Sequence, residues 1–266
     1  MAKRLRRILL TNDDGVDAPG LKVLEEVANE LADDVWVVAP DHDQSGISHS
    51  LSLHAPLRVS RKDARRFSVS GTPGDCVVMA VRHLMDEPPE LILSGINRGA
   101  NIGVETVFSG TVGAAMTGML LGIPSMALSQ AFSDRDNIPW STARSRAPDV
   151  IRMFAGGSWS AASCLNINFP DCAAESAGEV VLTTQGRGHL DDVQVVAGTD
   201  PRKLDYFWLS LSRSVHVDAD SSEASAVAAG KISVTPLEFE RTSRRALADL
   251  IASRGCDGTA SCYSRS

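Results

Sequence analysis

The sequence predicts an α/β protein with a Rossmann-like, mostly parallel sheet that is flanked by helices. Short apolar runs of strand length alternate with stretches in which apolar residues have helical spacing. The runs carry few charges, as expected for strands that are buried in a parallel sheet. The length of 266 residues suits one large α/β domain, or such a domain with an arm.

The first strand, residues 8–10, runs into a loop that carries the adjacent carboxylates Asp13 and Asp14. A helical pattern at 21–31 and an apolar run at 35–39 follow, which together predict a strand–helix–strand unit with parallel pairing. Ligands bind such sheets at the carboxyl ends of the strands. Two adjacent carboxylates repel each other unless a cation or a proton lies between them. The loop therefore predicts a divalent metal site, and the alternative is a solvated turn with a helix N-cap.

Three further loops carry polar or glycine-rich sequence after a predicted strand. Residues 41–50 are polar and can supply oxygen ligands, and residues 94–103 have the glycines of a loop that wraps a ligand with its backbone. Residues 109–111 begin a helix that reaches residue 120, so their amide groups and hydroxyls predict a phosphate-binding site. A plain Ser/Thr N-cap is the alternative for this segment.

The remaining elements follow from the same patterns. The central part of the chain continues the alternation of strands and helices. Beyond residue 179 the apolar runs are separated by polar segments without helical periodicity, which predicts hairpins. The expected elements are strands at 67–70, 90–93, 125–129, 164–169, 180–184, 206–212 and 231–234, a turn at 71–75, and helices at 76–84, 140–154 and 242–253.

The expected organisation is a single domain over residues 1–254, with an arm at about 180–235 and a flexible tail at 255–266. Hairpins that project from a domain often mediate oligomers, so we expect a homodimer or homotetramer. The alternative is an ordinary antiparallel extension of the sheet edge.

Composition excludes several classes of protein. A net charge of -7 and a pI of about 5.4 disfavour duplex nucleic acid or an anionic membrane as partner. The five cysteines lack paired spacing, which favours reduced thiols and a cytoplasmic location. We found no signal peptide and no run long enough to span a membrane. His42, His49 and His54 are interpreted as surface residues rather than metal ligands, because the first loop offers only oxygens.

With its motifs taken in order, the chain resembles the SurE family of stationary-phase survival nucleotidases. The resemblance implies a Rossmann-like fold and divalent-metal-dependent phosphatase activity on nucleoside 5′-monophosphates, with the 3′ position left open. The matching segments are ILLTNDDGVDAPGL (8–21), APDHDQSGISHSLSL (39–53), SGTPGDCV (70–77), ELILSGINRGANIG (90–103), FSGTVGAAMTG (108–118), NINFP (166–170) and ISVTPL (232–237).

The resemblance also implies roles for individual residues. One Mg²⁺ or Mn²⁺ per subunit would be held by side-chain oxygens, and the two aspartates among its ligands are the catalytic candidates. The implied metal ligands are Asp13, Asp14, Ser45 and Asn97, and the phosphate-binding candidates are Asn12, Asn101, Ser109, Gly110 and Thr111. Four residues depart from the common pattern of the family, namely His49, Glu105, Phe108 and Thr117.

Two other enzyme classes fit the first loop less well. A haloacid-dehalogenase phosphatase needs Asp-x-Asp with the first Asp as nucleophile, but Asn12 stands two residues before Asp14. A nucleoside hydrolase needs an Asp-x-Asp-x-x-x-Asp-Asp spacing, which is absent. The non-enzyme alternative is a sensor that binds a metal and a nucleotide without turning the nucleotide over.

Overall fold

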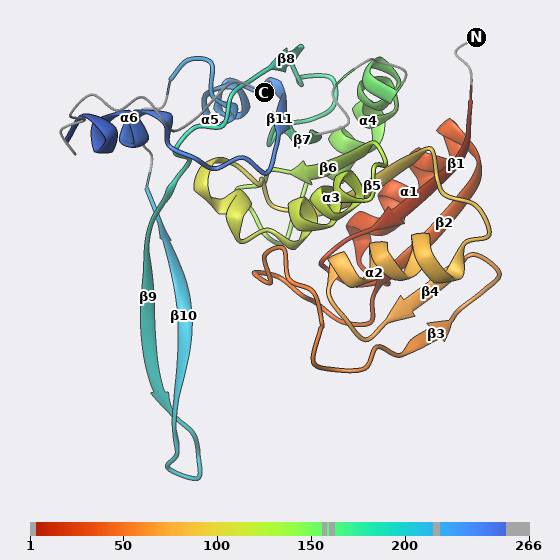
Figure 1. Cartoon of the computed structure of the whole chain (residues 1–266), viewed down its shortest axis with the longest axis horizontal. Coiled ribbons are helices and arrows are strands. Elements are labelled where there is room, and N and C mark those ends of the chain that lie inside the picture. Colours follow the sequence, from red (N-terminus) through yellow and green to blue (C-terminus); the bar gives the residue numbers. More distant parts are fainter. Residues whose placement is uncertain (1–3, 156–158, 160–162, 215–218, 254–266) are drawn as a thin grey trace, which may run out of the picture.

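The computed structural model describes residues 4–155, 159, 163–214 and 219–253, and at its centre lies a nine-stranded sheet (Figure 1). The strands are β1 (Leu5–Thr11), β2 (Ala32–Pro40), β3 (Val59–Arg61), β4 (Arg66–Val69), β5 (Leu91–Arg98), β6 (Ser125–Gln130), β7 (Cys164–Phe169), β8 (Val180–Leu182) and β11 (Ile232–Leu237). Their order across the sheet is β3-β4-β2-β1-β5-β6-β7-β11-β8. Neighbouring strands from β4 to β7 pair in parallel, whereas β3 and β11 pair antiparallel with β4 and β7. The predicted mostly parallel, Rossmann-like sheet is confirmed.

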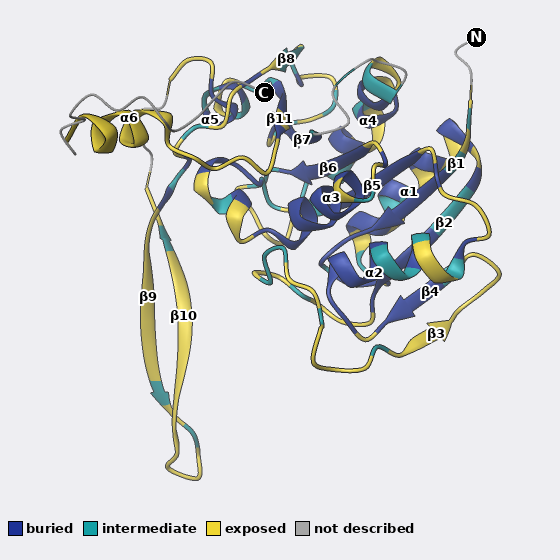
Figure 2. Cartoon of the chain, viewed as in Figure 1, coloured by how far each residue is buried: buried dark blue, intermediate teal, exposed yellow. Residues whose placement is uncertain are grey.

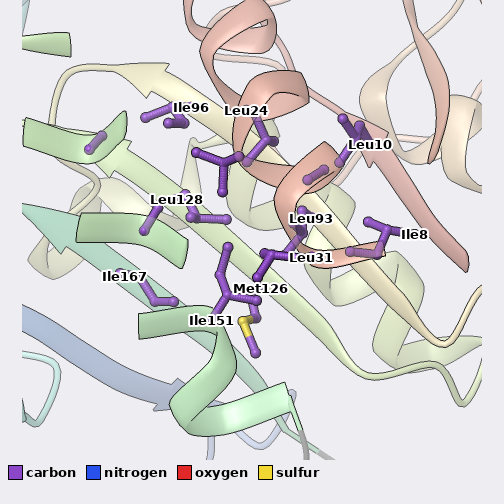
Figure 3. Packing of buried hydrophobic residues seen from close by; sticks show 14 of the residues in the cluster. Ile8, Leu10, Leu24, Leu31, Leu93, Ile96, Met126, Leu128, Ile151 and Ile167 are labelled. Carbon is purple, nitrogen blue, oxygen red and sulfur yellow. The ribbon is translucent and has the colours of Figure 1, made fainter. Parts of the chain in front are cut away.

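Helices cover both faces of this sheet. Helices α1 (Pro19–Leu31) and α4 (Trp140–Ala155) pack on one face, and α2 (Pro73–Met79) and α3 (Gly110–Leu120) pack on the other. Ile8 and Leu10 of β1 join the first core cluster, part of which Figure 3 shows, while Leu9 joins the second. Both faces of β1 are buried from Ile8 to Leu10, and this part of the strand is an uninterrupted apolar run, whereas Arg6 and Arg7 lie at its less buried start. No helix in the described part of the chain is both long and apolar enough to span a membrane.

Short helical segments complete the body. Segment η1 (Ala80–Leu84) continues α2, η2 (Gly103–Val107) precedes α3, and α5 (Glu223–Ala228) precedes β11. The predicted turn at 71–75 is only partly correct, because α2 already begins at Pro73. Thr72 and Asp75 form a capping box there, in which each side chain accepts a hydrogen bond from the backbone N–H of the other. Neither α5 nor β3 was predicted from the apolar pattern.

The loop predicted at 94–103 also begins later than expected. Strand β5 continues to Arg98, because pairing with β6 resumes at Asn97 and Ser129 after a register shift that follows Ser94. This shift is a local irregularity within an otherwise regular parallel pair.

A long antiparallel hairpin projects from the body (Figure 1). Strands β9 (Leu190–Thr199) and β10 (Asp205–Arg213) form a separate two-stranded sheet, and Figure 2 shows that most of it is exposed. We expected an arm over about 180–235, but β8 and β11 belong to the main sheet, so the projecting part is shorter. The final helix is present as α6 (Arg244–Ser253), and the predicted tail at 255–266 lies outside the described residues.

The strand order places a crevice beside β1. The chain passes from β1 to β2 on one side and later returns to β5 on the other side of β1. The carboxyl ends of β1 and β5 therefore lie at a topological switch point, where open α/β sheets bind ligands. The loops after Thr11 and Arg98 emerge side by side at this edge.

Gly20 lets α1 approach this edge closely. A Cβ atom at position 20 would lie 1.9 Å from the backbone oxygen of Ile96, in the segment that leads to Asn97. Such a distance is far below van der Waals contact, and the obstructing atom belongs to the backbone. Only glycine fits here without moving the helix or β5.

We expect Gly20→Ala to destabilise the protein by about 1–3 kcal/mol, because an extra methyl group in a packed interface forces the backbone to shift. Urea unfolding gives the measurement. Asn29→Ala, on the exposed face of the same helix, is the control and should be neutral or slightly stabilising, since alanine is the better helix former. A Gly20→Ala protein as stable as the parent would contradict the close approach described here.

Candidate active site at the carboxyl ends of β1 and β5

Asp13 lies two residues beyond the end of β1 and has a buried carboxylate. Its side chain is enclosed by the start of α3, where the hydroxyl of Thr111 donates a hydrogen bond of 2.5 Å to Oδ1. A Cβ atom on Gly110 would lie 2.8 Å from the Cβ of Asp13, so this approach requires glycine. Burial raises the pKa of Asp13 from 3.8 to about 6, although the Thr111 hydrogen bond opposes the change. The described residues provide no salt-bridge partner for Asp13.

Asp14 is partly buried and faces the end of β5. Its Oδ2 accepts a hydrogen bond of 3.3 Å from the backbone N–H of Arg98. Burial is the main reason why the pKa of Asp14 is raised, and the nearby charge of Asp43 adds to this effect, whereas Arg98 opposes it. The two predicted carboxylates therefore lie in a site whose surroundings disfavour two uncompensated negative charges.

The second polar loop, residues 41–50, is fastened to this site. The backbone N–H of Gln44 donates to the carbonyl oxygen of Asp13 at 2.7 Å, and the N–H of Ser48 donates to the carbonyl oxygen of Phe108 at 2.9 Å. Ser45, the ligand implied by the family resemblance, follows Gln44 directly. The structure thus brings the loop of Ser45 against both the carboxylates and the segment that leads into α3.

Asn97 and Asn101, at the end of β5 and in the loop after it, are both held by hydrogen bonds. The side-chain amide of Asn97 donates to the carbonyl oxygen of Gly99 at 2.8 Å, which leaves the Asn97 side-chain oxygen available. Both backbone polar groups of Asn101 are hydrogen-bonded to β7. Its N–H donates to the side-chain oxygen of Asn168, and its C=O accepts from the side-chain amides of Asn166 and Asn168. Within the described residues, no hydrogen bond joins Ser45 or Asn97 directly to either aspartate.

The remaining phosphate-binding candidates lie around the same crevice. Ser109 is the N-cap of α3 and accepts from the N–H of Val112, so the cap that the sequence offered as the alternative is present. Asn12 is fully buried, and its amide donates to the carbonyl oxygen of Gly15 at 2.9 Å. Its side-chain oxygen is buried without a hydrogen-bond partner. The site therefore has a helix N-terminus and an unsatisfied buried oxygen near the carboxylates.

A cavity of about 400 Å³ opens beside Asp14. Its wall combines carboxylates, guanidinium groups and apolar surface. The lining residues are Asp14, Ala18, Pro19, Gly20, Asp43, Arg98, Arg135, Asp136, Asn137, Ile138 and Trp140. A concave space next to pKa-shifted carboxylates is the expected form of a small-molecule site.

Comparison with known proteins identifies the family of this chain. A family model described as Survival protein SurE matches residues 8–192. The chain belongs to the SurE family. It is 58% identical over 250 residues to 5'-nucleotidase SurE 1 of Burkholderia lata, covering 94% of this chain and 96% of that protein. It is 47% identical over 255 residues to 5'-nucleotidase SurE of Brucella canis, covering 94% and 99% respectively. A crystal structure of the SurE protein from Aquifex aeolicus matches with a TM-score of 0.78 and 33% identity, covering 93% of this chain and 99% of that one.

Three of the four departures from the SurE pattern have partners in this structure. Nε2 of His49 and the hydroxyl of Thr117 are hydrogen-bonded at 2.8 Å, so these two departures contact each other. The His49 ring also stacks on Phe239, and Glu105 forms an ion pair of 2.7 Å with Arg213. Phe108 is exposed, and the structure gives no reason for the change there.

The three histidines near the second polar loop differ in exposure. His42 and His54 are exposed, as expected of surface residues, whereas His49 is half-buried. In the described part of the chain no group of three or more His, Cys, Asp or Glu side chains is arranged to hold a metal ion. The ligand set implied for this SurE chain contains only two carboxylates, and its other donors are a hydroxyl and an amide oxygen.

Sequence reasoning missed two residues that support the site. Asp43 accepts hydrogen bonds from Ser45, and Asn168 binds the backbone of Asn101 from a strand 67 positions away. The two-residue spacing of Asp43 and Ser45 is a common turn pattern and was a usable signal. Asn168 belongs to the matched NINFP segment, but its contact with Asn101 depends on strand order.

The raised pKa of Asp13 makes the stability of the metal-free protein depend on pH. The pKa of Asp13 is higher in the folded protein than in the unfolded chain. The stabilising contribution of the protonated carboxyl group is therefore fully present below pH 3.8, and it is lost as pH rises through about 6. We therefore expect metal-free Asp13→Asn to gain about 2 kcal/mol of unfolding free energy over the parent between pH 4 and pH 7.5.

The measurement is urea unfolding of both proteins in a chelating buffer at several pH values. Asp17→Asn, which alters an exposed carboxylate in the same loop, is the control and should show no such pH-dependent gain. A constant difference between Asp13→Asn and the parent from pH 4 to 7.5 would contradict the buried, uncompensated charge.

Proposed function

We propose that this chain is a divalent-metal-dependent hydrolase that removes phosphate from nucleoside 5′-monophosphates, with the 3′ position left open. The main support is the pair of carboxylates at the switch point, onto which the N-terminus of α3 closes. Its relatives in Burkholderia lata and Brucella canis are named 5'-nucleotidases and match nearly the whole chain. The two lines of support are independent, since one rests on local geometry and the other on overall similarity.

The donor set fits a hard cation such as Mg²⁺ or Mn²⁺. Asp13 is a buried carboxylate with a raised pKa and no salt-bridge partner among the described residues, as expected of a group that meets a cation. The proposed ligands are the carboxylates of Asp13 and Asp14, the hydroxyl of Ser45 and the side-chain oxygen of Asn97. All four are oxygen donors, which suits one Mg²⁺ or Mn²⁺ better than zinc.

The bound cation would polarise a phosphate oxygen and lower the pKa of a water molecule. The protein's own groups then have distinct tasks. Asp14, the more exposed of the two catalytic candidates, is placed to accept a proton from the attacking water. The buried carboxylate of Asp13 is fixed by the hydrogen bond from Thr111.

The start of α3 and the loop after β5 would bind the phosphate. Backbone N–H groups at a helix N-terminus attract anions, which supports Ser109, Gly110 and Thr111 in this role. The backbone of Asn101 is held by β7, and its side-chain amide donates to the hydroxyl of Ser129 at 2.9 Å, which fixes the side chain. Asn12 is the remaining candidate. Fixed donors stabilise the charge that develops on the transferred phosphate without reorganising.

We further propose that the chain forms a homo-oligomer in the cytoplasm. The hairpin exposes Val195, Phe207, Trp208 and Leu209, and α6 exposes Leu250. Apolar surface of this extent is typical of a protein–protein interface. The cysteines of the described residues are free, which supports a reducing compartment.

The first test is release of inorganic phosphate from AMP and GMP in the presence of Mn²⁺. We expect release with added metal and none after chelation, because the cation supplies charge stabilisation and activates water. A protein that binds Mn²⁺ but releases no phosphate from any mononucleotide or aryl phosphate would instead be the sensor considered above.

We expect Asp14→Asn to lower kcat by about a hundredfold or more, because the substitution removes a negatively charged ligand and the proposed proton acceptor. Asp17→Asn is the matched control in the same loop and should retain the activity of the parent. Circular dichroism checks that both variants fold. Activity near that of the parent in folded Asp14→Asn would remove this residue from the mechanism.

A further inference from the structure

Asp43 lies at the edge of the site, yet it is not among the proposed metal or phosphate ligands. Its Oδ1 accepts two hydrogen bonds from Ser45, one of 2.6 Å from the hydroxyl and one of 2.8 Å from the backbone N–H. A serine hydroxyl has a single proton to donate. When that proton is donated to Asp43, the lone pairs of the Ser45 oxygen remain free for another partner.

The position of Asp43 relative to the carboxylates is well defined. It lines the same cavity as Asp14. The next residue, Gln44, is bonded through its N–H to the carbonyl oxygen of Asp13 at 2.7 Å. The backbone of Asp43 also lies close to Gly15: a Cβ atom added to Gly15 would be 3.7 Å from the backbone nitrogen of Asp43. The hydroxyl of Ser45 is therefore oriented by Asp43, whose backbone is held next to the first loop.

We propose that Asp43 is a positioning residue that sets the affinity of the site for its divalent cation by orienting the hydroxyl of Ser45. This inference rests on the metal site of the proposed function. A hydroxyl binds a cation through a lone pair, so its proton must point elsewhere. Asp43 supplies the acceptor that keeps the proton away, and it holds the side chain in one rotamer before the cation arrives. Partners that orient a metal ligand commonly change metal affinity by about 10–100-fold.

A purely local role for Asp43 makes a different prediction. The bond from the Ser45 backbone N–H is a turn contact that any Asp at this position can make. If the carboxylate only shaped the loop, or only added negative charge, its effect on the cation would not depend on the Ser45 hydroxyl. A positioning role requires that dependence, which a double-mutant cycle measures directly.

The experiment is titration of the full-length, metal-free protein with Mn²⁺, followed by electron paramagnetic resonance of the free ion in 0.5 M KCl. High salt suppresses the contribution of exposed charges at a distance. We expect Asp43→Ala to weaken Mn²⁺ binding by about tenfold or more. Asp43→Asn, whose amide oxygen can accept the same two hydrogen bonds, should restore the affinity to within about threefold of the parent.

The cycle is completed with Ser45→Ala. We expect the double variant to bind Mn²⁺ no more weakly than Ser45→Ala alone, because Asp43 then has no hydroxyl to orient. Asp136→Ala is the matched control, since Asp136 is an exposed carboxylate of the same cavity and is not bonded to Ser45. Its affinity should stay within about twofold of the parent, because the lost charge is screened.

Three results would overturn this role for Asp43. They are unchanged affinity in Asp43→Ala, additive losses in the double variant, and an equal loss in Asp136→Ala. A folded parent that binds no Mn²⁺ would remove the metal site itself and this inference with it. The two failures are therefore distinguished by the parent protein alone.

Discussion

The burial of one carboxylate is the constraint on which this end of the molecule depends. Asp13 lies within the protein without a salt-bridge partner among the described residues, and its surroundings favour the neutral form. Two segments nevertheless converge on it, the start of α3 and the second polar loop. Thr111 donates to its carboxylate, Gln44 donates to its carbonyl oxygen, and Gly110 leaves room for its side chain. An arrangement that costs folding energy is retained at functional sites, and here it defines where a cation and a phosphate would meet.

Much of this arrangement could be predicted from the sequence because it is local. The apolar run of β1, the helical spacing of α1 and the turn chemistry between them each depend on neighbouring residues. Parallel pairing of β1 with β2 follows from the crossover helix, and the structure confirms it. The acidic loop therefore had to lie at the carboxyl end of a strand. The start of α3 was likewise identified by Ser109 and the helical pattern that follows.

The remaining features depend on contacts between distant positions, which spacing alone does not reveal. Ser45 and Asn97 entered the site only through the family resemblance, because the position of their segments relative to Asp13 depends on strand order and, for Asn97, on the shift within β5. Strand β9 has charged and small residues among its apolar ones and was not predicted as a strand. Helix α5 is only six residues long, too short for a periodic signal. The bond between Ser45 and Asp43 was missed although the spacing was visible.

The contact between His49 and Thr117 has an evolutionary consequence. Asn and Glu are common at these positions in the family, and here both are replaced by residues that bond to each other. Thr117 is buried and its short side chain leaves space beside the imidazole, which is itself half-buried. Without His49, Thr117 would still donate to the carbonyl oxygen of Gly113 at 2.9 Å. Without Thr117, the half-buried imidazole of His49 would lose its hydrogen-bond partner, at a cost of about 1–3 kcal/mol. The two positions therefore form an epistatic pair, and a chimera that takes the second loop from one relative and α3 from another would inherit the mismatch.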